Sequence, residues 1–400
     1  MIRSLVIQKI ASIEKKLLAP KLFYFAIAGT ISSLGPFYGL YYQQLGIPSP
    51  QIGILTGLPS LITLFGAPLW TGVADYTHRH RRTLLFTLVC SLVSLWLVMQ
   101  GHNFLALIPA VSLYAFFLAP AQPLTDNAVL RMLGERKHEF GKQRILGSFA
   151  AGIAGPLVST LTGWLGLRAA FYCGMAFLAS GLGFASRMEM DLPEDGPVEH
   201  PETVSYWKGL KVLLVDPRLA FFLFIVLLGM TARSPSFIYL YMHMSALGAP
   251  KSILGFTMVA LMIGELPLLF YSGRLLKRLG SRGLMIASLV STIIMLFTFA
   301  WMRSPWLGIA IHLIHGISYS GMWMAGVAYA NRLAPPGLGA TAQGLFNAIF
   351  NGLGFFFGSI FGGLLYDRYG GANLFFWCGL LAAFALFLFL LNQWKKSDKG

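Results

Sequence analysis

The feature that most constrains this chain is a series of apolar stretches, each about 20 residues long, that recurs from one end to the other. A helix of that length crosses the hydrocarbon core of a bilayer. In lipid, only helices and closed barrels satisfy all their backbone hydrogen bonds internally. The sequence therefore predicts an all-α membrane protein with about 12 transmembrane helices, near residues 21–43, 50–74, 83–101, 104–131, 143–165, 168–187, 217–243, 250–273, 283–302, 305–331, 340–366 and 372–393.

The composition is typical of a chain that faces lipid rather than water. Hydrophobic residues make up 56% and charged residues 11% of the 400 residues, whereas a soluble globular chain carries about 25% charged residues. So few charges cannot cover the surface of a water-soluble fold of this length.

The net charge of +15 would suit a nucleic-acid partner, but the positions of the charges exclude that interpretation. Of the 30 Lys and Arg residues, 25 lie in segments on one side of the predicted membrane, and Arg233 lies inside a helix. The opposite loops hold only Arg168, Lys251, Arg303 and Arg368. This bias follows the positive-inside rule and predicts cytoplasmic termini on a multi-pass protein of the inner or plasma membrane.

A polar segment divides the chain into two halves. Residues 188–216 hold 7 of the 15 acidic residues and several prolines, which is typical of a cytoplasmic linker. We expect an N-terminal six-helix bundle in residues 1–187, which begins with a basic cytoplasmic segment, and a C-terminal six-helix bundle in residues 217–400.

The two halves resemble each other in sequence. The pattern L-G-x-P-x4-G begins at Leu45 and again at Leu247, an offset of 202 residues. The pattern F-[YW]-C-G begins at Phe171 and again at Phe376, an offset of 205 residues. Chance matches between hydrophobic segments are the alternative. Several matches at nearly one offset favour two pseudo-symmetric bundles, an architecture that many secondary transporters share.

A loop after the second stretch carries a family resemblance. Residues 68–75, Pro-Leu-Trp-Thr-Gly-Val-Ala-Asp, resemble the loop between helices two and three of the major facilitator superfamily. The residues of this loop are Asp75, Arg79, Arg81 and Arg82, and those of a degenerate copy after helix eight are Gly273, Arg274, Lys277 and Arg278. The resemblance implies a loop that latches the cytoplasmic side shut. A simpler interpretation is that these cations anchor the helices at lipid headgroups.

The resemblance covers nearly the whole chain and is closest to the lactose-permease-like and phenylpropionate-permease-like branch, through residues 123–126, 144–148 and 315–316. It implies a proton symporter that works as a monomer. The chain departs from the family at Thr71 and His78, where the usual loop has glycine. Helix ten carries no carboxylate and helix nine no arginine before Arg303, so the proton route of that branch cannot be transferred unchanged.

Glu265 is a carboxylate within a predicted membrane helix, flanked by Gly264 and Pro267. Charges inside a bilayer are costly and are usually functional. Because a carboxylate in an apolar site can hold a proton and release it when hydrated, Glu265 is the candidate proton-coupling residue. The alternative is a structural carboxylate paired with Arg233.

His312 and His315 lie one turn apart on helix ten, and Tyr319 and Trp323 continue the same face. Histidine titrates near neutral pH, so one of the two could exchange a proton with Glu265. A buried histidine without a proton-transfer role is the alternative.

Asp126 and Arg144 lie on consecutive helices. In the branch that this chain resembles, the matching acid and arginine hold the substrate. An arginine fork binds a carboxylate or two hydroxyls, and the acid accepts from hydroxyls. The alternative is an ion pair that clamps the two helices together.

Further polar residues are expected to line a substrate cavity. Helix eleven places Gln343, Asn347 and Asn351 on one stripe, which would be costly against lipid. Tyr38 of helix one and Arg233 of helix seven complete the set of candidate residues. A polar cavity with aromatic walls suits a sugar, a nucleoside or an aromatic acid.

These features predict proton-coupled symport of a small organic solute by alternating access. A proton-driven antiporter that exports small molecules is the first alternative, and a receptor built on the same fold is the second. No HExxH or GxSxG motif and no large soluble domain is present in the sequence. We therefore expect no enzyme activity, no cofactor and no bound metal.

Overall fold

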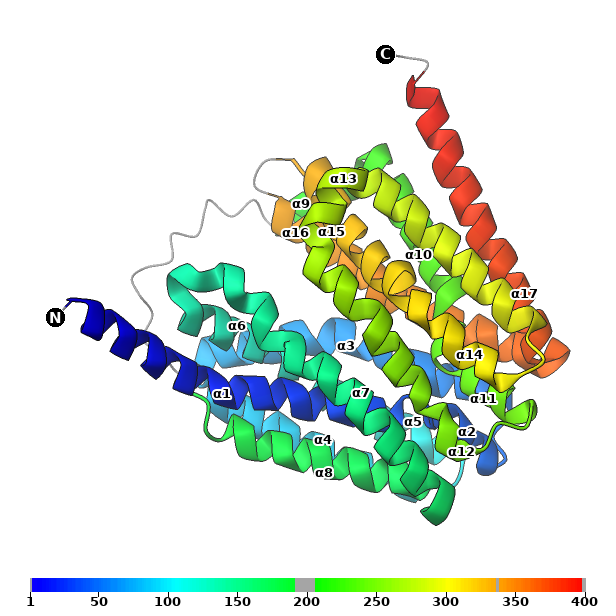
Figure 1. Cartoon of the computed structure of the whole chain (residues 1–400), viewed down its shortest axis with the longest axis horizontal. Helices are drawn as coiled ribbons and strands as arrows, with labels where there is room; N and C mark the ends of the chain where they lie inside the picture. Colours follow the sequence, from blue (N-terminus) through cyan, green and yellow to red (C-terminus); the bar gives the residue numbers. More distant parts are fainter. Residues whose placement is uncertain (1, 191–205, 336–337, 398–400) are drawn as a thin grey trace. The chain divides into compact units, whose positions relative to one another are not determined.

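The structure is a computed structural model that describes residues 2–190, 206–335 and 338–397, and these residues form helices and turns without a strand. The helices of the first half (Figure 1) are α1 (Ile2–Leu34), α2 (Tyr38–Gln44), α3 (Ser49–Thr77), α4 (His80–Gln100), α5 (Phe104–Leu118), α6 (Ala121–Leu133), the 3₁₀ helix η1 (Gly134–Glu139), α7 (Phe140–Leu165) and α8 (Arg168–Ala185).

The second half begins with a helix inside the segment that we expected to be a linker. This helix is α9 (Tyr206–Val215), and residues 191–205 of the linker lie outside the described residues. The remaining elements are α10 (Pro217–Arg233), η2 (Ser234–Phe237), α11 (Tyr239–Ala246), α12 (Lys251–Leu254), α13 (Phe256–Trp301), α14 (Pro305–Ile311), η3 (His312–Ile314), η4 (Gly316–Gly321), α15 (Met322–Leu333), α16 (Gly339–Asn347), η5 (Ala348–Leu353) and α17 (Gly354–Ser397).

Within the described residues, 10 helical stretches are long and apolar enough to cross a membrane. The count is lower than our prediction for two reasons. The stretch Thr341–Leu391 is counted once, although its 51 residues are enough for two crossings and Gly370 interrupts it with a φ of 77°. The predicted helix 305–331 is not counted because it is built from the short elements α14, η3, η4 and α15.

Prolines break three helices that we expected to be continuous. Pro36 separates α1 from α2, Pro120 separates α5 from α6, and Pro235 lies in the 3₁₀ turn η2 between α10 and α11. Proline has no backbone N–H to donate and its ring crowds the preceding turn, so the helix changes direction there.

The internal repeat is visible in the backbone. Six of the seven described residues with positive φ form pairs that lie 202 to 204 residues apart, namely Gly46 and Gly248, His78 and Gly280, and Gly166 and Gly370. Positive φ is a costly conformation for residues other than glycine. The two halves therefore turn at corresponding points between their helices.

Backbone contacts divide the described residues into two compact units. Unit 1 takes its residues from Met1–Phe37, Leu61–Pro197 and Lys251–Met258, and unit 2 from Tyr38–Ser60, Val198–Pro250 and Val259–Gly400. The division of the chain at residues 188–216 stays a prediction.

Each unit is held by helix packing around its own apolar residues. In unit 1, α1 packs against α7 and α8, and α4 packs against α5 and α8 (Figure 1). In unit 2, α10 packs against α17, and α15 against α16. The main core of unit 2 contains the buried side chains Phe222, Met230, Phe346 and Phe350.

Candidate functional site

Arg233, the last residue of α10, is the most deeply buried charged side chain among the described residues of unit 2, with an exposed fraction of 0%. Its Nη2 lies 2.8 Å from Nδ1 and 3.1 Å from Nε2 of His315, and its Nε donates to Ser318 Oγ over 3.3 Å. The guanidinium carbon lies 4.7 Å from the ring centre of Phe237 and 4.8 Å from that of Tyr319. Arg233 is therefore held by two aromatic rings, an imidazole and a hydroxyl.

The remaining terminal nitrogen of Arg233 has no partner among the described residues. Nη1 is buried and makes no hydrogen bond to any of them. None of the described carboxylates forms an ion pair with Arg233 within 4.0 Å, so the alternative of a direct pair with Glu265 is absent from this structure. The N–H groups of a buried guanidinium normally donate to a carboxylate. In this site, Nη1 lacks such an acceptor among the described residues.

Glu265 lies on α13, half-buried, where its Oε1 accepts a hydrogen bond of 2.6 Å from Ser320 Oγ. Two glycines bring the main chains together at this point. A Cβ on Gly264 would collide with the carbonyl oxygen of Leu313, and a Cβ on Gly316 would collide with that of Gly264. Because both positions lack side chains, Glu265 lies beside η4. It is also close enough to Arg233 for an electrostatic interaction.

The two predicted histidines are buried and stack on each other. Their ring centres are 5.8 Å apart with an interplanar angle of 11°, and His312 Nδ1 lies 2.7 Å from the carbonyl oxygen of Gly308. Because that carbonyl only accepts, Nδ1 of His312 carries the proton. His315 therefore contacts Arg233 directly. His312 stacks on the His315 ring and makes no hydrogen bond to Arg233 among the described contacts.

Two of the aromatic and amide residues that we placed on regular helices lie on π turns. Tyr319 lies in η4 and Asn351 in η5, and the hydroxyl of Tyr319 donates to Asn351 Oδ1 over 3.2 Å. Trp323 is 40% exposed, Asn347 is exposed and Gln343 is half-buried. The structure thus joins Asn351 to the cluster around Arg233. It shows no such link for the other three among the described contacts.

Ser318, Ser320 and Phe237 belong to this cluster but were missed by the sequence analysis. Serines are common in membrane helices, where they bond to the carbonyl four residues earlier, so their occurrence carries no signal.

A second polar group lies in unit 1. The hydroxyl of Tyr24 on α1 donates to Asp126 Oδ1 over 2.5 Å, and Arg144 Nη1 lies 3.9 Å from Asp126 Oδ2. The guanidinium carbon of Arg144 is 5.9 Å from the ring centre of Tyr24 and 6.0 Å from that of Phe140. Asp126 and Arg144 are thus neighbours as predicted, while Tyr24 was missed because no sequence spacing relates α1 to α6.

Tyr38, the remaining cavity candidate, begins α2 in unit 2. Its ring stacks on Tyr42, with centres 5.9 Å apart and an interplanar angle of 21°. The neighbouring Gly39 lies against Ile238 and Met242, so α2 packs on α11.

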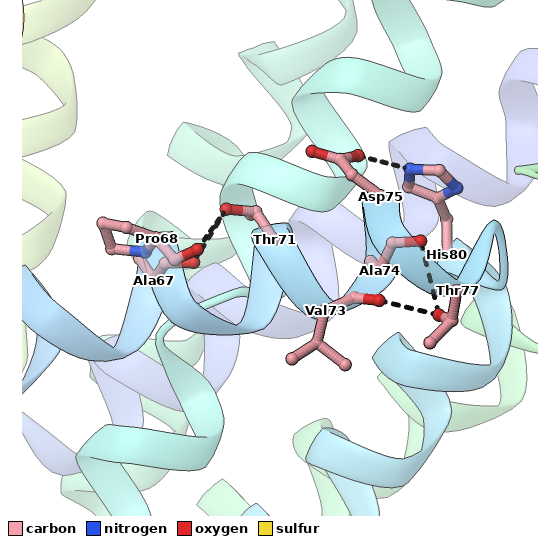
Figure 2. Close-up of polar contacts among 8 residues, drawn as sticks. All are labelled: Ala67, Pro68, Thr71, Val73, Ala74, Asp75, Thr77 and His80. Atoms are coloured by element: carbon pink, nitrogen blue, oxygen red, sulfur yellow. Dashed lines mark hydrogen bonds and ion pairs between the residues drawn. The ribbon is translucent and has the colours of Figure 1, made fainter. Parts of the chain in front are cut away.

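The loop after α3 is held by one side-chain pair. Asp75 Oδ1 lies 2.8 Å from His80 Nε2, and the imidazole is largely buried while the carboxylate is exposed (Figure 2). Thr71 stands where the family's loop usually has glycine. Its hydroxyl donates to the carbonyl oxygens of Ala67 and Pro68 (Figure 2). His80 was not predicted, because its pairing with Asp75 depends on the turn between α3 and α4, while the neighbouring Arg79, Arg81 and Arg82 are exposed.

His78 and Gly280 show that the second loop is a structural copy of the first. Both have positive φ, 52° and 66°, at the position where the family's loop usually has glycine. In the second loop, Gly273, Arg274, Lys277 and Arg278 are exposed on α13, and Arg274 lies over the ring of Tyr271 at 5.6 Å. The turn between the two helices is therefore kept although the charged residues differ.

The family of this chain follows from its similarity to known proteins. Residues 17–377 match the MFS_1 like family. The maltose permease of Geobacillus stearothermophilus is 29% identical over 363 residues, 89% of each chain. The uncharacterized transporter YwbF of Bacillus subtilis (strain 168) is 25% identical over 387 residues, 94% of each chain.

Among solved structures, a mutant form of the nucleoside transporter NupG superposes with a TM-score of 0.84 at 18% identity, covering 94% of this chain and 99% of that chain. This likeness shows the fold, an all-α membrane fold of the major facilitator type. The family match extends the conclusion to activity, because its members are transporters and not enzymes. The chain therefore belongs to the MFS_1 like family of the major facilitator superfamily, and it is a multi-pass plasma-membrane transporter of a small molecule.

Proposed function

We propose that this transporter is a proton-coupled symporter that works by alternating access, with Glu265 as the residue that binds the proton. The observation that carries the proposal is the environment of the Glu265 carboxylate. It lies in an apolar helix, accepts a hydrogen bond from Ser320, and forms no ion pair with any described cation. A carboxylate without a bound cation can gain and lose a proton without breaking a salt bridge.

The histidines extend the proposal. His315 lies between His312 and Arg233, and Arg233 interacts electrostatically with Glu265. A proton that arrives on Glu265 removes a negative charge from the neighbourhood of Arg233. We assign proton coupling to Glu265, His315 and His312 as a group, with Glu265 as the carrier.

The substrate site in this proposal has two parts that we treat separately. In unit 2, the candidate contacts are Arg233, Tyr319, Asn351, Asn347, Gln343, Trp323 and Tyr38. In unit 1, they are Asp126 and Arg144, with Tyr24 as an added member. The similarity to a maltose permease and to a nucleoside transporter supports a sugar or nucleoside, whereas the arginine and its aromatic neighbours support an aromatic acid.

The loop residues are assigned to gating. We propose that the Asp75–His80 pair and the cations at positions 79, 81 and 82 hold the cytoplasmic ends of α3 and α4 together. The matching cations of the second loop, Arg274, Lys277 and Arg278, then act at the corresponding place in the other half. The proposal also includes cytoplasmic termini and a monomeric transporter.

The test is proton movement in proteoliposomes that contain a pH-sensitive dye, with sugars, nucleosides and aromatic acids added outside. We expect one compound class to drive protons inward with wild-type protein, and Glu265→Gln to abolish uphill uptake while exchange of labelled for unlabelled substrate continues. The matched control is Glu189→Gln, because Glu189 forms an exposed ion pair with Lys16 and should contribute little.

Two results would contradict the proposal. Uphill uptake that survives Glu265→Gln would remove Glu265 from the proton route. Proton movement opposite to substrate movement would replace symport with antiport, which is the exporter alternative.

A further inference from the structure

A wide groove runs along the surface of unit 2, where α17 packs on α10. Its volume is about 1010 Å³, close to the upper end of the range of about 300–1,000 Å³ that small-molecule sites occupy. The lining is mostly apolar, with Leu227 and Leu228 from α10 and Phe361, Leu364 and Leu381 from α17. None of the described residues that line it belongs to the candidate sites above. The groove is therefore separate from the proposed proton and substrate sites.

Two glycines and a proline form the floor of the groove. A Cβ on Gly358 would collide with Ser234 Oγ, and a Cβ on Gly362 would collide with the side chains of Tyr239 and Pro235. The missing side chains let α17 lie close against the turn η2, which follows α10. Gly358, Gly362 and Pro235 all line the groove, so this close approach forms its floor between walls of larger side chains.

The walls of the groove are exposed on a part of the chain that spans the membrane. Phe361, Leu364 and Trp377 are 52%, 49% and 51% exposed, and all three belong to the apolar stretch Thr341–Leu391. An exposed apolar patch on a membrane protein is a contact surface for lipid or for another protein. The apolar part of the groove thus fits a hydrocarbon chain.

The groove ends at two side chains of opposite charge. Asp367 and Arg368 line it shortly before Gly370, which interrupts α17 with a φ of 77°. Because this interruption divides a stretch of 51 apolar residues into two membrane crossings, the two charges lie at a surface of the bilayer. Tyr369 and Trp377 also line the groove, and both residue types are enriched at the level of the lipid headgroups. The groove therefore leads from the hydrocarbon core to the headgroups.

Both charges at this end are available to a ligand. Asp367 and Arg368 are exposed, and neither forms an ion pair within 4.0 Å with any described residue. The guanidinium carbon of Arg368 lies 5.5 Å from the ring centre of Tyr369, which holds the side chain at the groove. A guanidinium binds a phosphate through two parallel N–H bonds, and a carboxylate accepts hydrogen bonds from an ammonium group. An anion and a cation carried by one molecule would therefore match this end of the groove.

We propose that the groove binds one zwitterionic phospholipid. Its phosphate accepts hydrogen bonds from Arg368, its ammonium group contacts Asp367, and an acyl chain lies along Leu228 and Phe361. An anionic phospholipid satisfies Arg368 but leaves the Asp367 carboxylate without a cation. A small zwitterion satisfies both charges but leaves the apolar walls without a partner. The inference does not depend on the proposed proton coupling, because no residue of that proposal lines the groove.

The experiment is native mass spectrometry of the full-length protein, purified and delipidated in detergent and then titrated with one lipid at a time. The measured mass counts both the bound lipids and the copies of the chain. The probes are phosphatidylethanolamine, phosphatidylcholine and phosphatidylglycerol with identical acyl chains, and glycerophosphoethanolamine, which has the headgroup without acyl chains. Comparison of the first two shows whether a primary or a quaternary ammonium group is preferred.

We expect one molecule of a zwitterionic lipid to saturate the protein and to bind about threefold more tightly than phosphatidylglycerol, because Asp367 contributes an additional ion pair. Glycerophosphoethanolamine should bind at least about a hundredfold more weakly, since it buries no acyl CH₂ groups in the groove. Bound lipid should also raise the temperature of thermal unfolding, because it binds the folded state alone.

Variants assign the two charges. We expect Arg368→Gln to weaken binding of the zwitterionic lipid about tenfold, because a charge-assisted hydrogen bond to the phosphate is lost. Arg368→Lys should retain part of the affinity, since lysine keeps the charge without the paired donors. Asp367→Asn should remove the preference over phosphatidylglycerol. Arg303→Gln is the matched control, because it removes an exposed cation of unit 2 that does not line the groove, and it should bind lipid as wild type does.

Three outcomes overturn the inference. The first is equal binding of all three phospholipids that Arg368→Gln leaves unchanged, which would indicate an unspecific lipid contact. The second is binding of glycerophosphoethanolamine as tight as that of the intact lipid, which would exclude the groove. The third is a dimer of the chain that carries no lipid and resists its addition, which would assign the groove to a second copy. Thermal unfolding of each variant without lipid shows whether it is folded, and the comparison of probes on wild-type protein decides the question if one variant is not.

Discussion

At the scale of single residues, the hydrogen bond from Ser320 to Glu265 is the contact that most directly bears on the proton site that we propose. The bond is 2.6 Å long and is the one side-chain hydrogen bond that the described residues make to this carboxylate. A hydrogen bond to a charged group contributes about 1.5–3 kcal/mol. Ser320 therefore positions the Glu265 carboxylate and stabilises its ionised form, although the serine hydroxyl carries no charge.

We predict that Ser320→Ala reduces proton-coupled uptake by about tenfold, because the ionised form of Glu265 loses its donor. The measurement is the initial rate of proton entry into proteoliposomes. Ser291→Ala is the matched control, since Ser291 lies on α13 and bonds only to the carbonyl of Ala287. Equal rates for Ser320→Ala and Ser291→Ala would show that Ser320 does not act on Glu265.

At the scale of elements, the site depends on a close approach between α13 and the segment that runs from η3 into η4. Gly264 and Gly316 allow that approach because each Cβ would meet a backbone carbonyl of the other segment. Backbone cannot move aside as a flexible side chain can. The glycine pair therefore sets the position of Glu265 relative to the Arg233 cluster.

We predict that Gly316→Ala lowers the free energy of unfolding by about 1–3 kcal/mol, which is the usual cost of forcing extra atoms into a packed interface. Thermal unfolding in detergent measures it. Gly344→Ala in α16 is the control, because a Cβ there meets no atom within 4 Å, and alanine favours the helix by about 1 kcal/mol. A Gly316→Ala variant as stable as Gly344→Ala would mean that the two segments are not in contact.

At the scale of the whole molecule, the sequence predicted the class of fold and the repeat, and it did not predict the local departures from regular helices. The length of the apolar stretches and the distribution of Lys and Arg between the loops can be read from the sequence alone, without knowledge of any contact. The π turns η4 and η5 depend on a hydrogen-bond register that composition does not encode. Likewise, the partners Tyr24, His80 and Ser320 are set by tertiary packing between helices, which no spacing in the chain reveals.

The orientation of the molecule in the membrane is the last prediction, and it follows from the charge bias alone. The positive-inside rule places Arg187, which follows α8, in the cytoplasm and Arg303, which precedes α14, outside. Both side chains are exposed. In a background where Cys90, Cys173 and Cys378 are replaced by serine, we expect a membrane-impermeant thiol reagent to label Arg303→Cys in intact cells and to leave Arg187→Cys unlabelled.

Permeabilised cells provide the control for that experiment, because both cysteines should then react. The reverse pattern in intact cells would place the termini outside the cell. It would also place the loop that contains Asp75 and His80 on the outer side of the membrane. In the proposed gating scheme, the Asp75 carboxylate would then act on the outer side of the transporter. Orientation therefore decides on which side of the membrane the proposed gating loop would act, whereas the direction of proton movement follows the proton gradient across the membrane.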